Sequence, residues 1–223
     1  MGNFMLVLQY ATDGNLRKHL QNKQKDGFYK ILWVDLIRIA KEIALGLSHL
    51  HDKNIVHRDL HSMNILINDG RALITDFGIS KQLDTVTTEN VFELNEKSDI
   101  YSLGVLFWEL TSGIPPFNNL RDNAAIISQI ASGVREKIIE NTPLDYSNLF
   151  RKCWSTEPDH RPSLAEILAE FDKLSAQNVE FITNNVNSGS KRSKRSANSG
   201  SSTDKCPVEL IENTISEEIK VLL

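Results

Sequence analysis

The sequence predicts a mainly α-helical domain over residues 1–174, followed by a tail over residues 175–223. Apolar residues recur with helical periodicity through most of the first segment, and a single short hairpin pattern interrupts them. After residue 175 this periodicity gives way to a low-complexity stretch rich in Asn, Ser and Gly, which buries too little apolar surface to fold. The domain is long enough to bury a core, and its 40% hydrophobic content is ordinary for a globular protein.

The first half of the domain is expected to contain a strand, a helix and a hairpin. Residues 4–10, of which residues 4–8 are all apolar, are expected to form a buried strand. Residues 31–51 carry an apolar stripe that predicts a long amphipathic helix. Residues 65–75 contain two apolar runs separated by Asp69 and Gly70, a pair typical of tight hairpin turns.

The second half is expected to be helical. Residues 100–110 are apolar nearly all round, which predicts a helix buried in the centre of the domain. Ser163 and Glu166 form the capping-box pattern that begins a helix. We expect three further helices, at residues 121–131, 146–154 and 163–175. Residues expected in the core are Trp33, Trp108, Trp154 and Cys153. In the tail, residues 184–203 are expected to be disordered, and residues 208–223 could form a short docking helix.

Charge and cysteine content bear on the kind of protein and its location. The net charge of −4 argues against a general nucleic-acid-binding protein. Cys153 and Cys206 have neither CxxC nor metal-ligand spacing, which favours a reducing, intracellular setting. No segment is apolar over the length of a membrane span, so we expect no membrane attachment and a cytoplasmic location. The basic cluster at residues 191–195 is either a solvated linker or a nuclear-import patch.

One motif carries recognisable chemistry. Residues 57–64 read His-Arg-Asp-Leu-His-Ser-Met-Asn, and residues 76–78 read Asp-Phe-Gly, with the hairpin between them. This arrangement resembles the catalytic core of the protein kinases, H-R-D-L-x-x-x-N followed by D-F-G. The resemblance implies a kinase-like C-lobe with a remnant of the hinge strand at its start. The histidine at position 61 looks most like the tyrosine-kinase-like branch of that family.

Phosphoryl transfer explains these residue types. Mg²⁺ prefers hard oxygen ligands, which Asn64 and Asp76 would supply on either side of the hairpin. The resemblance makes Asp59 the group that accepts the proton of an incoming protein hydroxyl. Arg58 would hold a phosphorylated residue in the segment after Gly78. ATP and Mg²⁺ are therefore the implied cofactors, and a protein is the implied substrate.

The resemblance also implies a nucleotide site at the beginning of the chain. By position, Leu8 would be the gatekeeper, and the backbone of Gln9 and Ala11 would hydrogen-bond adenine. Asn15 would reach the ribose, and Leu66 would lie beneath the adenine ring.

Other residues are expected to support the site. Asp99 would tie down the backbone of the catalytic loop. His57 and Phe77 are expected to pack in the core and align that loop. Arg161 matches an arginine that pairs, in relatives, with the glutamate of an A-P-E motif.

Two features depart from the kinase pattern. No G-x-G-x-x-G sequence and no V-A-I-K strand precede the hinge, so we expect most of the N-lobe to be missing. Only 20 residues separate Gly78 from Asp99, and the sequence contains no Pro-Glu dipeptide. We therefore expect the A-P-E segment to be missing and Arg161 to lack its partner.

The sequence thus supports a protein kinase domain, with serine or threonine favoured over tyrosine as the acceptor. The alternatives are a catalytically inactive kinase-fold fragment that acts as a binding or scaffold protein, or a truncated gene model. In the scaffold reading, a partner chain would cover the face left by the missing lobe. We expect weak nucleotide affinity and little activity from the chain alone, because the parts that cover and neutralise the phosphates are absent.

Overall fold

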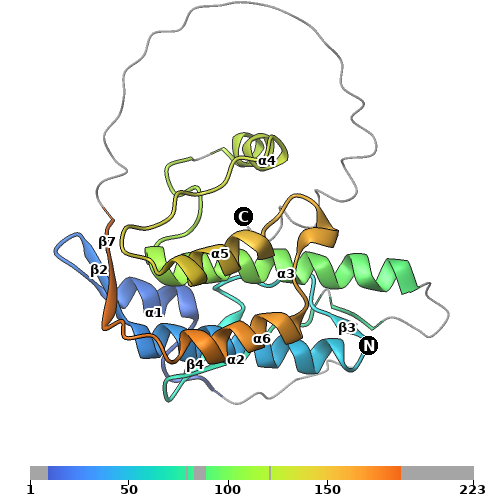
Figure 1. Cartoon of the computed structure of the whole chain (residues 1–223), viewed down its shortest axis with the longest axis horizontal. Coiled ribbons are helices and arrows are strands. Elements are labelled where there is room, and N and C mark those ends of the chain that lie inside the picture. The colour runs from blue at the N-terminus through green and yellow to red at the C-terminus, as the bar shows by residue number, and fades with distance from the viewer. Residues whose placement is uncertain (1–9, 79, 83–88, 121, 187–223) are drawn as a thin grey trace, which may run out of the picture.

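The computed structural model describes residues 10–78, 80–82, 89–120 and 122–186 (Figure 1). Its helices are α1 (Leu16–Asn22), α2 (Trp33–His51), α3 (Glu89–Ser112), α4 (Asn123–Ala131), α5 (Leu144–Cys153) and α6 (Leu164–Leu174), with a 3-10 turn at Pro158–His160. Its strands are β1 (Gln24–Lys25), β2 (Phe28–Leu32), β3 (Ile55–Val56), β4 (Ile65–Asn68), β5 (Arg71–Ile74), β6 (Lys81–Gln82) and β7 (Phe181–Asn185). They pair antiparallel as β1-β2-β7, β3-β6 and β4-β5.

The core is built around α3, which crosses the middle of the molecule in contact with α2 and α5 (Figure 1). Residues 99–113 are all buried, which confirms the prediction of a central helix that is apolar nearly all round. Aromatic rings link the neighbouring helices, since Phe107 of α3 lies 5.1 Å from Phe171 and 6.3 Å from Tyr146. The predicted core residues Trp33, Trp108, Trp154 and Cys153 are each no more than 5% exposed.

The predicted hairpin is present. Strands β4 and β5 pair from Ile65 opposite Ile74 to Asn68 opposite Arg71. Asp69 and Gly70 both have positive φ angles, of 50° and 74°. A two-residue turn of this kind matches the right-handed twist of the strands it joins, so this local sequence fixes the register of the hairpin.

The predicted helices are present with small changes at their ends. Helix α6 begins with the expected capping box, in which the Ser163 hydroxyl accepts the Glu166 N–H and the Glu166 carboxylate accepts the Ser163 N–H. Helix α2 begins at Trp33 rather than at Ile31, because Ile31 and Leu32 belong to strand β2.

Strand β7 lies beyond the position at which the sequence analysis begins the tail. Its five residues pair with the whole of β2, and Ile182 is completely buried. The two strands run side by side in Figure 1. The packed part of the chain therefore continues past residue 175 to at least residue 185. The segment is short and polar apart from Phe181 and Ile182, so its own composition gives little sign of this packing.

Several expectations concern residues that the structure does not describe. The predicted strand at residues 4–10 is described only at Tyr10, which is 82% exposed and outside any strand. The basic cluster at residues 191–195 and the helix expected at residues 208–223 lie outside the described residues. Within the described ranges, no helix combines the length and the apolar character needed to cross a bilayer.

Candidate active site

The loop of residues 57–64 is held by Asp99 of α3, which is completely buried. Its carboxylate accepts the main-chain N–H of His57 at 2.9 Å and that of Arg58 at 2.8 Å. His51, at the end of α2, lies 2.8 Å from the same carboxylate through Nε2. Arg58 has a φ of 70°, a strained conformation that these contacts compensate. The expected role of Asp99 in tying down the loop backbone is confirmed.

His57 connects this loop to the end of the hairpin. Its Nε2 lies 3.0 Å from the carbonyl oxygen of Thr75, and its Nδ1 lies 3.3 Å from the main-chain nitrogen of Asp59. A carbonyl can only accept and an N–H can only donate, so the ring carries its proton on Nε2. His57 is completely buried, which confirms the prediction that it packs inside and aligns the loop.

Asp59 and Asn64 meet directly. The Asn64 side-chain nitrogen donates to the Asp59 main-chain carbonyl at 2.9 Å and to its carboxylate Oδ2 at 3.1 Å. The amide oxygen Oδ1 and nitrogen Nδ2 leave the same carbon in different directions, so Oδ1 takes no part in these two hydrogen bonds. Asp59 and Asn64 thus bring one carboxylate and one side-chain amide together within residues 59–64.

The hairpin brings Asp76 to the same end of the site. Thr75 donates its main-chain N–H to the carbonyl of Asn64 at 2.9 Å, one step beyond the Ile65–Ile74 pair. Asp76 therefore follows directly after the residue that pairs with Asn64. Its φ of 61° marks a second strained position, and its carboxylate Oδ1 accepts the Gly78 N–H at 3.2 Å.

The oxygen donors of Asn64 and Asp76 suit Mg²⁺, which takes hard oxygen ligands and keeps several waters. Among the described residues, no three His, Cys, Asp or Glu side chains are grouped to bind a metal. An ion held by Asn64 and Asp76 would therefore need further oxygens from a bound phosphate and from water. The two residues fit a metal that arrives with a nucleotide.

The residues expected at the nucleotide site are described in part. Leu8 and Gln9 lie outside the described residues, and Ala11 is half-buried in the segment before α1. Asn15 and Leu66 are neighbours in an isolated antiparallel bridge. The Asn15 side chain also caps α1 by accepting the Lys18 N–H at 2.9 Å. Leu66 is half-buried on the face of β4 opposite to the buried Ile65.

One supporting residue, Phe77, differs from expectation, and a second, Arg161, has backbone partners. Phe77 is 50% exposed rather than packed in the core, and one ring neighbour is His57, with centroids 5.5 Å apart and ring planes inclined by 55°. Arg161 is expected to lack the A-P-E glutamate that pairs with the matching arginine of relatives. Its guanidinium donates to the main-chain carbonyls of Ser155 and Lys97 at 2.8 and 2.9 Å. These backbone carbonyls help to satisfy the buried cation, and the expected absence of the glutamate partner stays a prediction.

His61 lies beside Asp59, with 3.7 Å between its Nε2 and the Asp59 Oδ1. Burial lowers the pKa of His61 below its usual 6.5, and the neighbouring Asp59 carboxylate opposes this effect. Burial therefore favours the neutral form of this imidazole. A neutral ring here provides a hydrogen-bonding group without a permanent positive charge.

Three side chains near the loop escaped the sequence analysis. Glu109 of α3 is 2% exposed and binds both the Ser62 hydroxyl, at 2.8 Å, and the Arg17 Nε, at 2.9 Å. The sequence signal for Glu109 is a single acidic residue within a largely apolar stretch of the helix. Such a buried charge requires partners, but the sequence alone does not say which ones.

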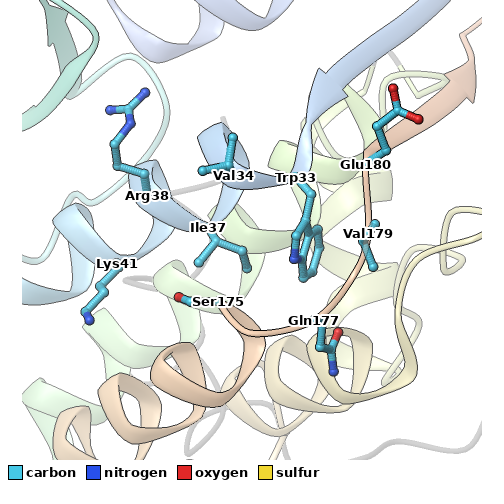
Figure 2. A pocket seen from close by; sticks show the side chains of 9 residues that line it. All are labelled: Trp33, Val34, Ile37, Arg38, Lys41, Ser175, Gln177, Val179 and Glu180. Atoms are coloured by element: carbon cyan, nitrogen blue, oxygen red, sulfur yellow. The ribbon is translucent and has the colours of Figure 1, made fainter.

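One concavity of the described surface is lined by other residues. A groove of about 380 Å³ separates the beginning of α2 from the segment that follows α6 (Figure 2). Trp33, Ile37 and Val179 form its apolar wall, and Arg38 and Lys41 lie along one side. None of the residues predicted for catalysis or nucleotide binding lines this groove.

Comparison with known proteins agrees with the motif. A family model for protein tyrosine and serine/threonine kinases matches residues 1–171. The chain is 34% identical over 197 residues to the probable serine/threonine-protein kinase roco8 of Dictyostelium discoideum, covering 77% of this chain and 10% of that protein. It is 29% identical over 187 residues to the serine/threonine/tyrosine-protein kinase HT1 of Arabidopsis thaliana, covering 76% and 47%. It is 28% identical over 205 residues to the tyrosine kinase receptor Cad96Ca of Drosophila melanogaster, covering 79% and 26%.

The helical domain, its hairpin and its anchored loop define a kinase-like fold. The chain belongs to the protein tyrosine and serine/threonine kinase family. It spans between a tenth and about half of the length of the relatives named above. The expectation that most of the N-lobe is missing stays a prediction.

Proposed function

We propose that this chain carries the catalytic loop of a protein kinase that transfers a phosphoryl group from ATP to a serine or threonine hydroxyl of a protein. The observation that carries the proposal is the junction of Asp59 with Asn64, joined to Asp76 through the Thr75–Asn64 hydrogen bond. In phosphoryl transfer the protein contributes position and charge stabilisation, and this junction supplies fixed oxygens for both tasks.

The roles follow from the chemistry of the groups. Asp59 accepts the proton of the acceptor hydroxyl as the hydroxyl oxygen bonds to the transferred phosphorus and ADP leaves. Asn64 and Asp76 would hold Mg²⁺, which would supply positive charge against the phosphate oxygens. Arg58 holds a phosphorylated residue of the following segment. Ala11, Asn15 and Leu66 contact the nucleoside, together with Leu8 and Gln9.

The test is a transfer assay on the 223-residue chain with γ-labelled Mg²⁺–ATP and a peptide library containing Ser, Thr and Tyr. We expect slow transfer to Ser and Thr, lowered at least about 100-fold in Asp59→Asn and in Asp76→Asn, because each removes a charge at the reacting centre. Asp159→Asn, an exposed carboxylate in the 3-10 turn, is the matched control and should retain wild-type activity. Labelling of Tyr alone would overturn the proposed acceptor class.

A second candidate function is a kinase-fold binding protein. The specific observation in its favour is the short segment of 20 residues between Gly78 and Asp99, without a Pro-Glu dipeptide. In that case wild type and Asp76→Asn should be equally inactive, and millimolar Mg²⁺–ATP should leave the Tm unchanged. A rise in Tm that Asp76→Asn abolishes would instead support nucleotide binding, since a ligand of the native state stabilises it.

A further inference from the structure

Helix α3 ends against the sheet β1-β2-β7, and each strand of that sheet supplies one side chain to the helix end. The last carbonyls of a helix have no partners within the helix and need other donors. From β2, the Tyr29 hydroxyl donates to the Leu110 carbonyl at 2.7 Å. From β1, the Gln24 side-chain nitrogen donates to the Gly113 carbonyl at 2.6 Å. From β7, the Asn184 side-chain nitrogen donates to the Ser112 carbonyl at 2.8 Å. The C-terminal strand β7 thus helps to complete the central helix.

The same turn of α3 carries Glu109, whose carboxylate holds the catalytic loop. Glu109 Oε1 accepts the Ser62 hydroxyl at 2.8 Å and lies 2.9 Å from the Arg17 Nε. Arg17 also donates its main-chain N–H to the Ser62 carbonyl at 3.1 Å. Ser62 lies in the loop between Asp59 and Asn64, so the side chain and the backbone of this residue are both fixed from outside the loop.

These contacts form one continuous path from the C-terminal strand to the site. We propose that strand β7 is a brace for the catalytic loop, because it fixes the last turn of α3 and so the Glu109 carboxylate that holds Ser62. The inference rests on the proposed function, since the brace matters for catalysis only if this loop performs it. Glu109 and Asn184 are positioning residues in this arrangement, and neither touches the reacting atoms.

The brace is itself held firmly. Strand β7 pairs with β2 along its length, and its own residue Ile182 is completely buried. Further hydrogen bonds close both ends of the pairing, from the Trp33 N–H to the Glu180 carbonyl and from the Val186 N–H to the Gly27 carbonyl, each at 3.0 Å. The strand can therefore transmit its position to α3. A displacement of about 1 Å in a catalytic group costs on the order of 100-fold in rate, so a small loosening is measurable.

The first arm of the test measures hydrogen exchange in the full chain and needs no catalytic activity. We expect amides of residues 57–64 to exchange about fivefold faster in Asn184→Ala, which removes a hydrogen bond of the path, and in Glu109→Gln, which removes the charge that pairs with Arg17. Amides of α6 should keep their wild-type rates. Thr183→Ala, on the other face of β7, is the matched control and should leave both regions unchanged.

The second arm measures transfer kinetics in the same variants. We expect kcat to fall about tenfold while the KM for ATP stays within about twofold, since the brace positions the loop rather than the nucleotide. Unchanged loop exchange in Asn184→Ala would overturn the brace, as would equal loosening of the loop and α6. Faster loop exchange in a chain without any transfer activity would support the brace and count against the proposed function.

Discussion

At the scale of single residues, the site depends on buried charges whose partners are fixed. Asp99 receives two main-chain N–H groups and the ring of His51, so its charge is compensated inside the core. The negative charge of Glu109 is less well compensated by its neighbours. Burial raises its pKa above the usual 4.5, and the nearby Arg17 guanidinium and Ser62 hydroxyl only partly oppose this effect.

The raised pKa of Glu109 predicts a pH dependence of stability. A carboxyl whose pKa is higher in the folded than in the unfolded chain binds its proton more tightly when folded, so stability falls as pH rises between the two values. The Tm of the wild type should therefore decrease relative to that of Glu109→Gln as the pH is raised from 4 toward 7. Thermal unfolding at several pH values measures this difference, and parallel curves would contradict the prediction.

Glu166 provides a control of opposite sign. Hydrogen bonds from the Ser163 backbone and hydroxyl lower the pKa of Glu166. A lowered pKa makes the wild type gain stability relative to Glu166→Gln as the pH rises through the usual glutamate range. The change should be small, because the side chain is exposed to solvent and its interactions are screened.

At the scale of elements, the contact between α3 and α5 depends on a glycine. A Cβ added at Gly104 would lie 2.7 Å from the Cys153 Cβ, 2.9 Å from the Trp154 nitrogen and 3.0 Å from the Phe150 oxygen. Two of these atoms are backbone and cannot move without shifting α5. Close approach of the two helices therefore requires the absence of a side chain at this position.

We expect Gly104→Ala to destabilise the protein by about 1–3 kcal/mol, although alanine is the better helix former. Gly46→Ala in α2 is the matched control, because its Cβ would approach only the flexible end of Ile74, at 3.1 Å. That substitution should be neutral or stabilise by up to about 1 kcal/mol. Urea unfolding of both variants measures the change in the free energy of unfolding. An equal change in the two variants would contradict the claim that close packing requires a glycine at position 104.

At the scale of the whole molecule, the end of the packed chain returns to its beginning. Strand β7 pairs with β2, and both are linked to the end of α3 in the middle of the sequence. Contacts between segments this far apart in sequence stabilise the domain only when all of it is folded.

Two truncations test where the folded unit ends. A chain ending at residue 186 retains β7 and should keep the wild-type Tm. A chain ending at residue 175 loses β7 and the buried Ile182, and we expect it to be less stable by at least about 2–4 kcal/mol, the usual cost of emptying such a site. An equal loss of Tm in the two chains would contradict this boundary.

Much of this protein could be predicted from local sequence because the forces involved act over a few residues. The turn at Asp69 and Gly70, the capping box at Ser163 and the apolar periodicity of the helices each specify their own element. Asp59, Asn64 and Asp76 were singled out by their resemblance to the kinase motif, and the hairpin between them is the local pattern that joins Asn64 to Thr75, next to Asp76.

Other features depend on long-range packing, which no local pattern encodes. The burial of Glu109 against Ser62 and Arg17 joins three separate elements, and the pairing of β7 with β2 joins opposite parts of the chain. The exposure of Phe77 has the same origin, because an aromatic residue is buried only where another element covers it. Local sequence therefore sets the elements of this kinase-family chain and the polar groups of the candidate site, whereas folding of the entire domain sets which buried charges meet and how the loop of residues 57–64 is held.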